Sequence, residues 1–455
     1  MQPDAYAGPD ARLIPAFQRT VREMSWYRTL LTEAGVEADA IIDASSFTRL
    51  APILTKANTF DRFPIDVLAA TTSIRDLAGV LTSSGHGGRF SFGLTSREEA
   101  AFGPEFVDTA LDAAFGVKSH PTLVINCLPM GVGFTSVCTT IATTSVREDM
   151  AVALVRTFGE HYEQIVLVAD PLFMKRLTDH AAAQALDWRH YRMQVLLGEE
   201  IFGEHFRGYV AACLGLEADD GTRGCIMSSF GVGELGLHLG YETPTTIALR
   251  RTVWRNPELA GDVLGHEVAP ASVPMFLAFN PRRTFVEIVD PDADGFGQLT
   301  MSMLDPGLPI PLLRYQTGDL ARLVDPSAAI AACRRHNIAL PGELPPMLVA
   351  LRGRSKDRLP NGADVGLYKD ALYADHAASR QLSGAFRLVV EGDRYTLHVQ
   401  RVVEAPKPGC EDDELAARIV RTLPDAWRPQ KVIVWPYERF PFGMSIDYER
   451  KFTYL

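Results

Sequence analysis

The stretch Pro309–Leu320, PIPLLRYQTGDL, decides how the rest of the chain is interpreted. An apolar run ends in Arg314 and Tyr315, and a Thr317-Gly318-Asp319 turn then places one carboxylate beside flexible backbone. A carboxylate in this position can accept two hydrogen bonds from neighbouring hydroxyl groups, as a ribose presents them. The alternative is an Asp that only closes a turn, which Asp often does.

The same segment, LLRYQTGDL, resembles the R-Y-x-T-G-D signature of adenylate-forming enzymes, especially the phenylacetate–coenzyme A ligases and the related acyl-protein synthetases. In that family the aspartate holds the ribose of ATP. The resemblance therefore implies that Asp319 binds the nucleotide, and that the other motifs of the family occur elsewhere in the chain in their usual order.

Bulk composition limits the class of protein. A chain of 455 residues is too long for one ordinary core, so two or more domains are expected. With 47% apolar and 22% charged residues, the composition is that of a globular protein. The formal charge of −11 argues against a general nucleic-acid binder or an anionic-membrane binder.

The cysteines and the apolar runs indicate a cellular location. The six cysteines are scattered without a C-x-x-C pair, which fits reduced thiols better than disulfides or a zinc site. The first ten residues, MQPDAYAGPD, lack the basic start and apolar core of a secretory signal. No apolar run reaches membrane-spanning length. We therefore expect a cytoplasmic protein without a membrane partner.

A Ser/Gly-rich string at 81–89, LTSSGHGGR, predicts a phosphate-binding loop. Small residues and glycines let backbone N–H groups approach phosphate oxygens, although an ordinary flexible loop has the same composition. The string resembles the S-S-G-T-T-G-K loop of the family, with His86 and Gly87 in place of the two threonines and Arg89 in place of the lysine. The resemblance implies nucleotide binding by four matching residues: Ser83, Ser84, Gly85 and Gly88.

Short apolar runs that alternate with helical patterns predict an α/β fold, with mostly parallel sheets covered by helices. The expected strands are 122–127, 164–169 and 193–197, and the capping boxes Ser96-x-x-Glu99 and Ser145-x-x-Glu148 are expected to open helices. Ligands of such sheets bind beyond the carboxyl ends of the strands. Gly133 and Phe134 follow the first of these strands, so we expect them to line a pocket for the acid, although Phe134 could equally be a core residue.

The segment Cys225–Gly236, CIMSSFGVGELG, allows two interpretations. It contains a literal G-x-G-x-x-G, the dinucleotide fingerprint, which needs a following helix and a later strand that ends in an acid. Gly240 and Pro244 interrupt that helix. The segment also resembles the Y-G-x-T-E motif of the family, which implies that Phe230 and Gly231 lie at the adenine or the acid, that Val232 lines the acid pocket and that Glu234 holds Mg²⁺.

The end of the chain is expected to form a second, smaller domain. Residues 284–304 predict a hairpin that leads into the Asp319 motif. The string Gly353–Asp357, GRSKD, then resembles the family's hinge, which implies that Arg354 assists at the ribose or phosphates and that Lys356 is the pivot. A charged turn is the alternative. The β-β-α-β pattern of 386–435 predicts a small α+β domain, so we expect domains at 1–353 and 354–455, the second being mobile.

A lysine near the end of the chain, Lys451, resembles the adenylation lysine of the family. Its point charge could lie between the acid carboxylate and the α-phosphate, whereas most terminal lysines are only solvated. Lys431 is the rival candidate.

Together the motifs imply an ATP-dependent, AMP-forming ligase that uses Mg²⁺ and activates a small aryl or medium-chain acid, most simply for transfer to coenzyme A. A carrier-protein thiol, an enzyme thiol or an amine is the alternative acceptor. A nucleotide-binding relative without turnover, or less readily an NAD-dependent oxidoreductase that uses Gly231, Gly233 and Gly236, remains open.

Overall fold

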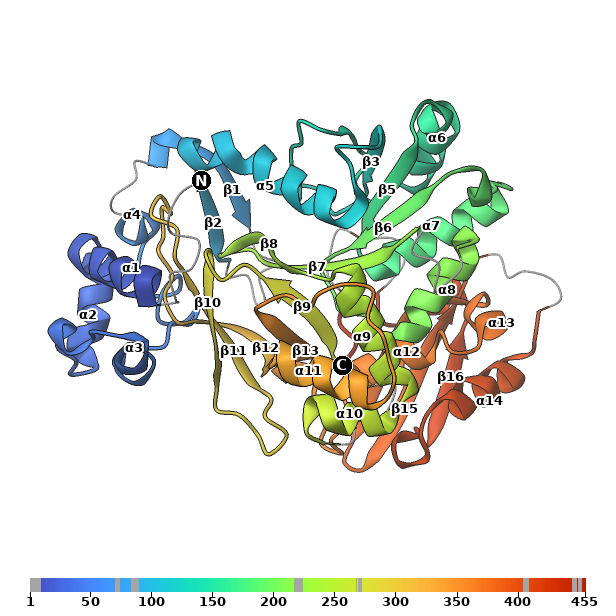
Figure 1. Ribbon diagram of the computed structural model, residues 1–455. Coiled ribbons are helices and arrows are strands. Elements are labelled where there is room, and N and C mark those ends of the chain that lie inside the picture. The colour runs from blue at the N-terminus through green and yellow to red at the C-terminus, as the bar shows by residue number, and fades with distance from the viewer. Residues whose placement is uncertain are drawn as a thin grey trace.

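An eleven-stranded sheet runs through the middle of the computed structural model, in the order β10-β11-β12-β13-β9-β8-β7-β6-β5-β3-β4 (Figure 1). The structure describes residues 10–69, 74–82, 90–216, 224–266, 268, 272–403, 409–443, 448 and 452–455. The strands of this sheet are β3 (Thr122–Asn126), β4 (Thr140–Thr143), β5 (Gln164–Ala169), β6 (Met193–Leu197), β7 (Ile226–Val232), β8 (Gly236–Tyr241), β9 (Met275–Phe279), β10 (Thr284–Val289), β11 (Gly297–Met303), β12 (Tyr315–Val324) and β13 (Leu348–Arg354).

One half of the sheet is parallel. Strands β4, β3, β5, β6 and β7 pair side by side in the same direction. Every residue of β3, β5 and β6 is buried, as expected of parallel strands that are covered on both faces. The three strands predicted from apolar runs are therefore confirmed.

The other half of the sheet is antiparallel. A tight turn joins β7 to β8, and such a turn can connect only antiparallel neighbours. From β8 outward every pairing is antiparallel, including the predicted hairpin of residues 284–304, in which β10 pairs with β11. The predicted α/β class with a large helix-covered sheet is confirmed, and the structure adds this antiparallel half.

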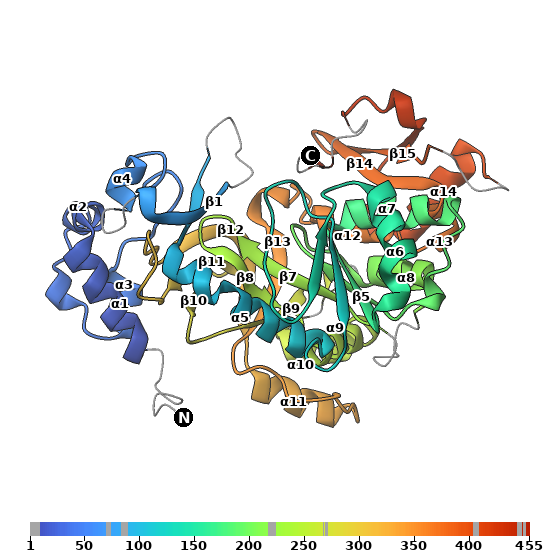
Figure 2. The same ribbon diagram turned by 90° about the horizontal axis from the view of Figure 1, so that it is seen from above.

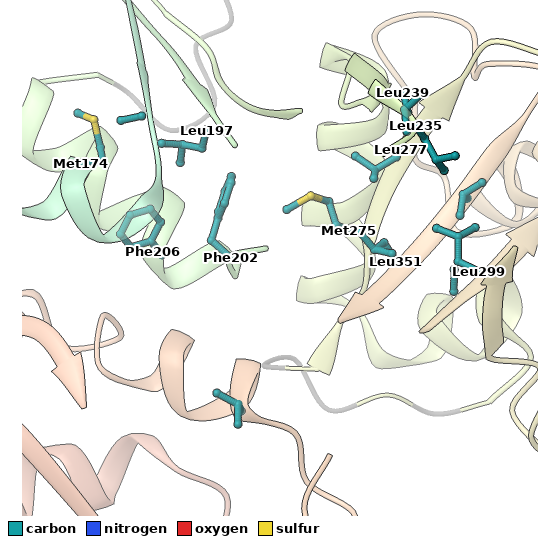
Figure 3. Packing of buried hydrophobic residues seen from close by; sticks show 14 of the residues in the cluster. Met174, Leu197, Phe202, Phe206, Leu235, Leu239, Met275, Leu277, Leu299 and Leu351 are labelled. Atoms are coloured by element: carbon teal, nitrogen blue, oxygen red, sulfur yellow. The ribbon is translucent and has the colours of Figure 1, made fainter. Parts of the chain in front are cut away.

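Helices cover both faces of the parallel half. Alternate residues of β3, β5 and β6 pack in one cluster with helices α6, α7 and α8, and the intervening residues pack in another cluster with α5 and α9. Figure 3 shows the first cluster as it continues from Leu197 and Phe206 to Leu277 and Leu351 in the antiparallel half. The helices are α1 (Asp10–Glu23), α2 (Ser25–Glu33), α3 (Ala44–Leu50), α4 (Ile65–Leu68), α5 (Arg97–Phe115), α6 (Glu148–Phe158), α7 (Pro171–Ala183), α8 (Glu204–Leu214), α9 (Pro244–Arg255), α10 (Pro257–Leu264), α11 (Pro326–Arg335), α12 (Val365–Ala371), α13 (His376–Ser379) and α14 (Asp412–Thr422).

The two predicted capping boxes differ in outcome. Ser96 and Glu99 cap α5 through reciprocal hydrogen bonds, which confirms the first. The second prediction is wrong, because α6 begins only at Glu148 with Arg147 as its N-cap residue. Ser145 lies outside the helix at φ 53°, where its hydroxyl is too early in the chain to cap the first turn.

The N-terminal helices α1–α4 gather at one end of the molecule, beside β10–β12 (Figure 2). A β-bridge between Leu54 and Tyr315 attaches this helical segment to the start of β12. A separate two-stranded sheet of β1 (Leu77–Thr82) and β2 (Phe92–Ser96) leads into α5. Tyr315 also pairs with Met301 of β11, so it lies between the N-terminal segment and the sheet.

The C-terminal part forms a small sheet of its own. Strand β14 (Leu382–Glu391) pairs antiparallel with β15 (Arg394–Arg401), and β15 pairs in parallel with β16 (Lys431–Trp435), with α14 between them in the chain. The predicted β-β-α-β pattern is confirmed. The expected division at residues 353 and 354 falls at the end of β13 and stays a prediction. No described helix combines the length and the apolarity needed to cross a membrane.

Candidate active site

The antiparallel register of β12 and β13 brings Asp319 and Arg354 together. The two residues are direct cross-strand partners, and Arg354 Nε lies 3.7 Å from Asp319 Oδ1. The Asp319 residue is only 8% exposed, whereas the Arg354 side chain is 37% exposed. A charged pair whose arginine ends a strand and is partly exposed can receive ribose hydroxyls or phosphate oxygens.

The predicted turn at Thr317-Gly318-Asp319 is wrong in its local structure, because these residues lie inside β12. The pairing with β11 shifts here, with Thr300 opposite Gln316 and Gln298 opposite Leu320, so the extra residues of β12 form a bulge. Gly318 adopts φ +82°, which glycine tolerates. Bulges re-aim side chains next to active sites, and this one directs Asp319 toward Arg354.

The turn between β7 and β8 holds Glu234, which joins three distant segments. Its Oε1 accepts hydrogen bonds from Ser91 Oγ at 2.6 Å and from the Tyr315 hydroxyl at 3.0 Å. Burial and the adjacent Glu234 carboxylate raise the pKa of Tyr315, so the phenol remains a hydrogen-bond donor. Neither Ser91 nor Tyr315 was assigned a role from sequence, although Tyr315 belongs to the R-Y-x-T-G-D string.

Strand β2 approaches this turn unusually closely. A Cβ atom on Gly93 would lie 2.1 Å from the carbonyl oxygen of Gly233, so only glycine fits at position 93. This contact places the downstream flank of the predicted phosphate loop against Glu234. The loop residues Ser83, Ser84, Gly85 and Gly88 themselves lie outside the described residues, as does Lys451.

The glycines of the G-x-G-x-x-G string lie in a β-hairpin. Gly231 is in β7, Gly233 is in the turn and Gly236 begins β8. The dinucleotide fingerprint requires a strand followed directly by a helix, so this geometry does not meet it. The hairpin removes the structural basis for the NAD interpretation.

The residues predicted to line the acid pocket separate into two groups. Phe230 and Val232 pack against the cluster that contains Phe279, with a Phe230–Phe279 centroid distance of 5.9 Å. Phe134 packs against the other cluster and contacts His238 of β8 edge to face at 5.9 Å. Gly133 lies beside Phe134 in an exposed loop. Phe134 and Phe230 therefore belong to opposite faces of the sheet.

The predicted pivot lies on the surface. Lys356 is exposed in a 3₁₀ turn, η6 (Ser355–Asp357), which follows β13. The Ser355 hydroxyl donates to the carbonyl oxygen of Gly318 at 3.3 Å, so the turn contacts the bulge that positions Asp319. Lys431, the alternative adenylation lysine, begins β16 and is exposed.

Comparisons with known proteins identify the fold. No family model matches the sequence, and no curated protein matches it. A crystal structure of 2-hydroxyisobutyryl-CoA ligase in the postadenylation state, in complex with R3-HIB-AMP, matches with a TM-score of 0.66 at 13% identity. The match covers 94% of this chain and 85% of that chain. The chain has the fold of the adenylate-forming acyl-CoA ligases.

Two states of that neighbour compare differently with this ligase fold. In complex with 2-HIB-AMP and CoA in the thioesterification state, it matches with a TM-score of 0.54 at 14% identity, over the same 94% and 85% of the two chains.

The C-terminal segment of the ligase fold contacts the carboxyl edge of the parallel strands. Glu200, which follows β6, accepts from Lys369 Nζ at 2.7 Å and from the Tyr454 hydroxyl at 3.1 Å. The Lys369 ammonium also lies 3.9 Å from the centroid of the Tyr454 ring. The backbone N–H of Leu388 donates to the carbonyl oxygen of Tyr454, which ties the segment to β14. Sequence analysis assigned no role to Glu200, Lys369 or Tyr454.

The same edge of the ligase fold supports a prediction on pH. Asp170 caps α7 by accepting from Phe173 N at 2.9 Å, while burial, with Glu200 and Glu199 nearby, raises the pKa of Asp170 to about 7. Between the ordinary value of 3.8 and about 7, the folded state keeps a proton that the unfolded chain has lost, so stability falls as pH rises. Asparagine caps helices equally well. Asp170→Asn should therefore gain stability over the parent as pH rises through this window, as measured by urea unfolding.

Asp187→Asn is the matched control for that experiment. Asp187 caps the short turn Trp188–His190, and its hydrogen bond with Arg189 lowers its pKa to about 2. A lowered pKa contributes stability that is complete above the ordinary value and is lost only as pH falls toward 2. The control should differ from the parent by a constant amount across the window of Asp170. A constant difference for Asp170→Asn as well would contradict the raised pKa.

Proposed function

We propose that the chain activates a small carboxylic acid with ATP, forming an acyl-adenylate and pyrophosphate, and then transfers the acyl group to a thiol. A carboxylate oxygen attacks the α-phosphorus while pyrophosphate leaves. The thiol sulfur then attacks the adenylate carbonyl and AMP leaves. The observation that carries the proposal is the convergence of Asp319 with Arg354, and of Glu234 with Tyr315, in a chain with the fold of acyl-CoA ligases.

Each residue of this site has a separate role in the proposed adenylation step. Asp319 would hold the ribose hydroxyls, with Arg354 beside it to orient the carboxylate and to meet phosphate oxygens. Glu234 would be the carboxylate that holds Mg²⁺, and its hydrogen bonds with Ser91 and Tyr315 at Oε1 orient the side chain. Mg²⁺ favours one or two carboxylates together with phosphate oxygens, and when bound it would neutralise charge on the phosphates. Positioning and charge neutralisation are the contribution of the protein.

Both halves of the proposed reaction use the C-terminal part. We infer that residues 354–455 form a lid that pivots at Lys356, with Lys451 brought to the α-phosphate for adenylation and withdrawn for transfer. Support comes from the exposed turn at 355–357 and from the hydrogen bond between Ser355 and Gly318. Hinges of this kind absorb their change in a few residues between packed elements.

The acceptor is proposed to be coenzyme A, because the solved neighbour is a CoA ligase. Transfer to a carrier-protein thiol, an enzyme thiol or an amine is the alternative. All six cysteines, each within the described part of the chain, are free thiols, which supports a cytoplasmic location. A panel of aryl and medium-chain acids, assayed for ATP–pyrophosphate exchange with and without coenzyme A, tests the reaction. No exchange with any acid would leave nucleotide binding without turnover, the alternative that rests on His86 and Gly87 in place of the two loop threonines.

Asp319→Ala should weaken ATP binding by about 1.5–3 kcal/mol, the scale of a hydrogen bond to a charged group. The substitution removes the acceptor for the ribose and leaves Arg354, which is partly exposed, in water. Calorimetric titration with ATP measures the loss. Asp319→Asn keeps one acceptor oxygen, so its ATP affinity should lie between those of Asp319→Ala and the parent. Equal affinity in all three proteins would show that Asp319 only shapes the strand.

A further inference from the structure

Strand β8 is distorted at His238, opposite the end of β7 that leads into Glu234. Phe230 pairs with Gly240 and Val232 pairs with Gly236, so Leu237, His238 and Leu239 together face one residue of β7. His238 adopts φ 60°, a left-handed conformation that is uncommon outside glycine. Strain of this kind persists where the surroundings enforce it, and it clusters at ligand sites. At this point the regular pairing of β7 with β8 is interrupted, and the His238 side chain leaves the alternating pattern of the strand.

One ring nitrogen of His238 has a hydrogen-bond partner among the described residues, and the other has none there. Nδ1 lies 3.1 Å from Ser229 Oγ of β7. Nε2 has almost no solvent-accessible surface and has no hydrogen-bond partner within the described part of the chain. A buried polar atom without a partner costs free energy, so a structure that keeps one usually has a ligand or a water for it.

The imidazole lies against Phe134, one of the residues predicted to line the acid pocket. Phe134 contacts the ring edge to face, from the loop that follows β3. The backbone N of His238 would lie 3.4 Å from a Cβ atom on Gly231, and His238 is four residues beyond Glu234. Phe134 itself packs with the apolar cluster that α5 and β3 share. The Nε2 atom is thus a buried polar atom of a ring that Phe134 contacts.

The loop that carries Phe134 has open space beside its two glycines. Gly131 and Gly133 flank it, and a Cβ atom on either glycine would meet nothing within 4 Å. Gly131, Gly133 and Thr135 are exposed.

The imidazole is neutral at physiological pH. Burial, and to a lesser degree the charge of Arg283, lowers the pKa of His238 to about 4. A neutral imidazole has one N–H donor and one acceptor nitrogen, and the rotatable Ser229 hydroxyl can serve either at Nδ1. Nε2 can therefore donate or accept, and a hydroxyl group is the ligand group that satisfies it in both tautomers. Arg283, whose charge reaches the imidazole, is already paired with Asp305 at 3.0 Å.

We propose that His238 is a specificity-determining residue of the acyl pocket, and that the preferred acid carries an uncharged hydroxyl group that hydrogen-bonds to His238 Nε2 while its apolar body lies against Phe134. This inference rests on the proposed function and adds the substrate class to it. A site that hydrogen-bonds a substrate hydroxyl discriminates against the analogue without it, because its own polar atom is then left unpaired.

The test compares acids that differ by one hydroxyl, in ATP–pyrophosphate exchange with the full-length protein. The pairs are the hydroxybenzoates with benzoate, 4-hydroxyphenylacetate with phenylacetate, and hydroxybutyrates with butyrate. In at least one pair the parent should prefer the hydroxylated acid in kcat/KM by on the order of ten- to a hundredfold. His238→Phe should bring that ratio close to one and leave the unsubstituted acid within a few fold. A structural role alone would lower both acids equally.

His238→Gln is the conservative variant, because its amide nitrogen reaches the place of Nε2, and it should restore part of the preference. An active parent with no preference in any pair overturns the inference and leaves the proposed function intact. If His238→Phe and His238→Gln lower kcat/KM equally for both acids of a pair, the inference is overturned as well. If the parent exchanges with no acid at all, the proposed function fails and this inference fails with it. The preference of the parent needs no variant, so the inference is testable even if His238→Phe does not fold.

Discussion

Glu234→Gln should lower the rate of ATP–pyrophosphate exchange by on the order of 10²–10³-fold, the usual effect of removing one preorganised electrostatic group. The amide oxygen can still accept from Ser91 and Tyr315, as Glu234 Oε1 does at 2.6 and 3.0 Å, so the shape of the turn persists. Only the negative charge is lost. Because that charge is proposed to hold Mg²⁺, raising the Mg²⁺ concentration should restore part of the rate.

The experiment measures exchange over a range of Mg²⁺ concentrations, with Glu391→Gln as the control. Glu391 is an exposed carboxylate at the end of β14, and its loss should leave the rate unchanged. Unfolding midpoints of both variants should lie near that of the parent. Parent-like exchange by Glu234→Gln at low Mg²⁺ would reduce Glu234 to a structural acceptor for Ser91 and Tyr315.

Arg314→Met should destabilise the fold by about 3–5 kcal/mol, the cost of removing one partner from a buried ion pair. Arg314 Nη2 lies 3.1 Å from Glu287 Oε1, and both side chains are less than a tenth exposed. Its Nη1 also donates to the carbonyl oxygen of Ala51, which attaches the N-terminal helices to the sheet. The variant leaves the Glu287 carboxylate buried without a counter-charge.

Urea unfolding of a double-mutant cycle with Glu287→Gln measures this effect. The double variant removes both charges and should be more stable than Arg314→Met alone. Burial already raises the pKa of Glu287, and loss of Arg314 raises it further, so the folded state favours the protonated acid. A raised pKa gives stability that is lost as pH rises, so the defect of Arg314→Met should shrink as pH falls. Equal stability of Arg314→Met and the parent would contradict the buried pair.

Local patterns in the sequence were sufficient to predict several of the helices and strands. The continuous apolar runs of β3, β5 and β6, and the hairpin, helix and strand of the C-terminal part, were predicted because burial on both faces and turn chemistry act on neighbouring residues. The order of the motifs was also visible in the chain, and it indicated the fold that comparison with solved structures shows.

Other features depend on which strands become neighbours. Asp319 and Arg354 are 35 positions apart, and only the register of β12 with β13 makes them partners. The bulge at Gly318 replaced a predicted turn because the chain gains more by pairing on both sides than by turning back.

The sequence by itself determined several of the elements and singled out the charged residues of the candidate site. Only the tertiary structure decided which of them meet. It brought Ser91 and Tyr315 to Glu234, separated Phe134 from Phe230 by the thickness of the sheet, and placed His238 beside Phe134. The physical reason is that periodicity and propensity act within a few residues, whereas strand pairing and register are set by burial and hydrogen bonding between segments far apart in the chain.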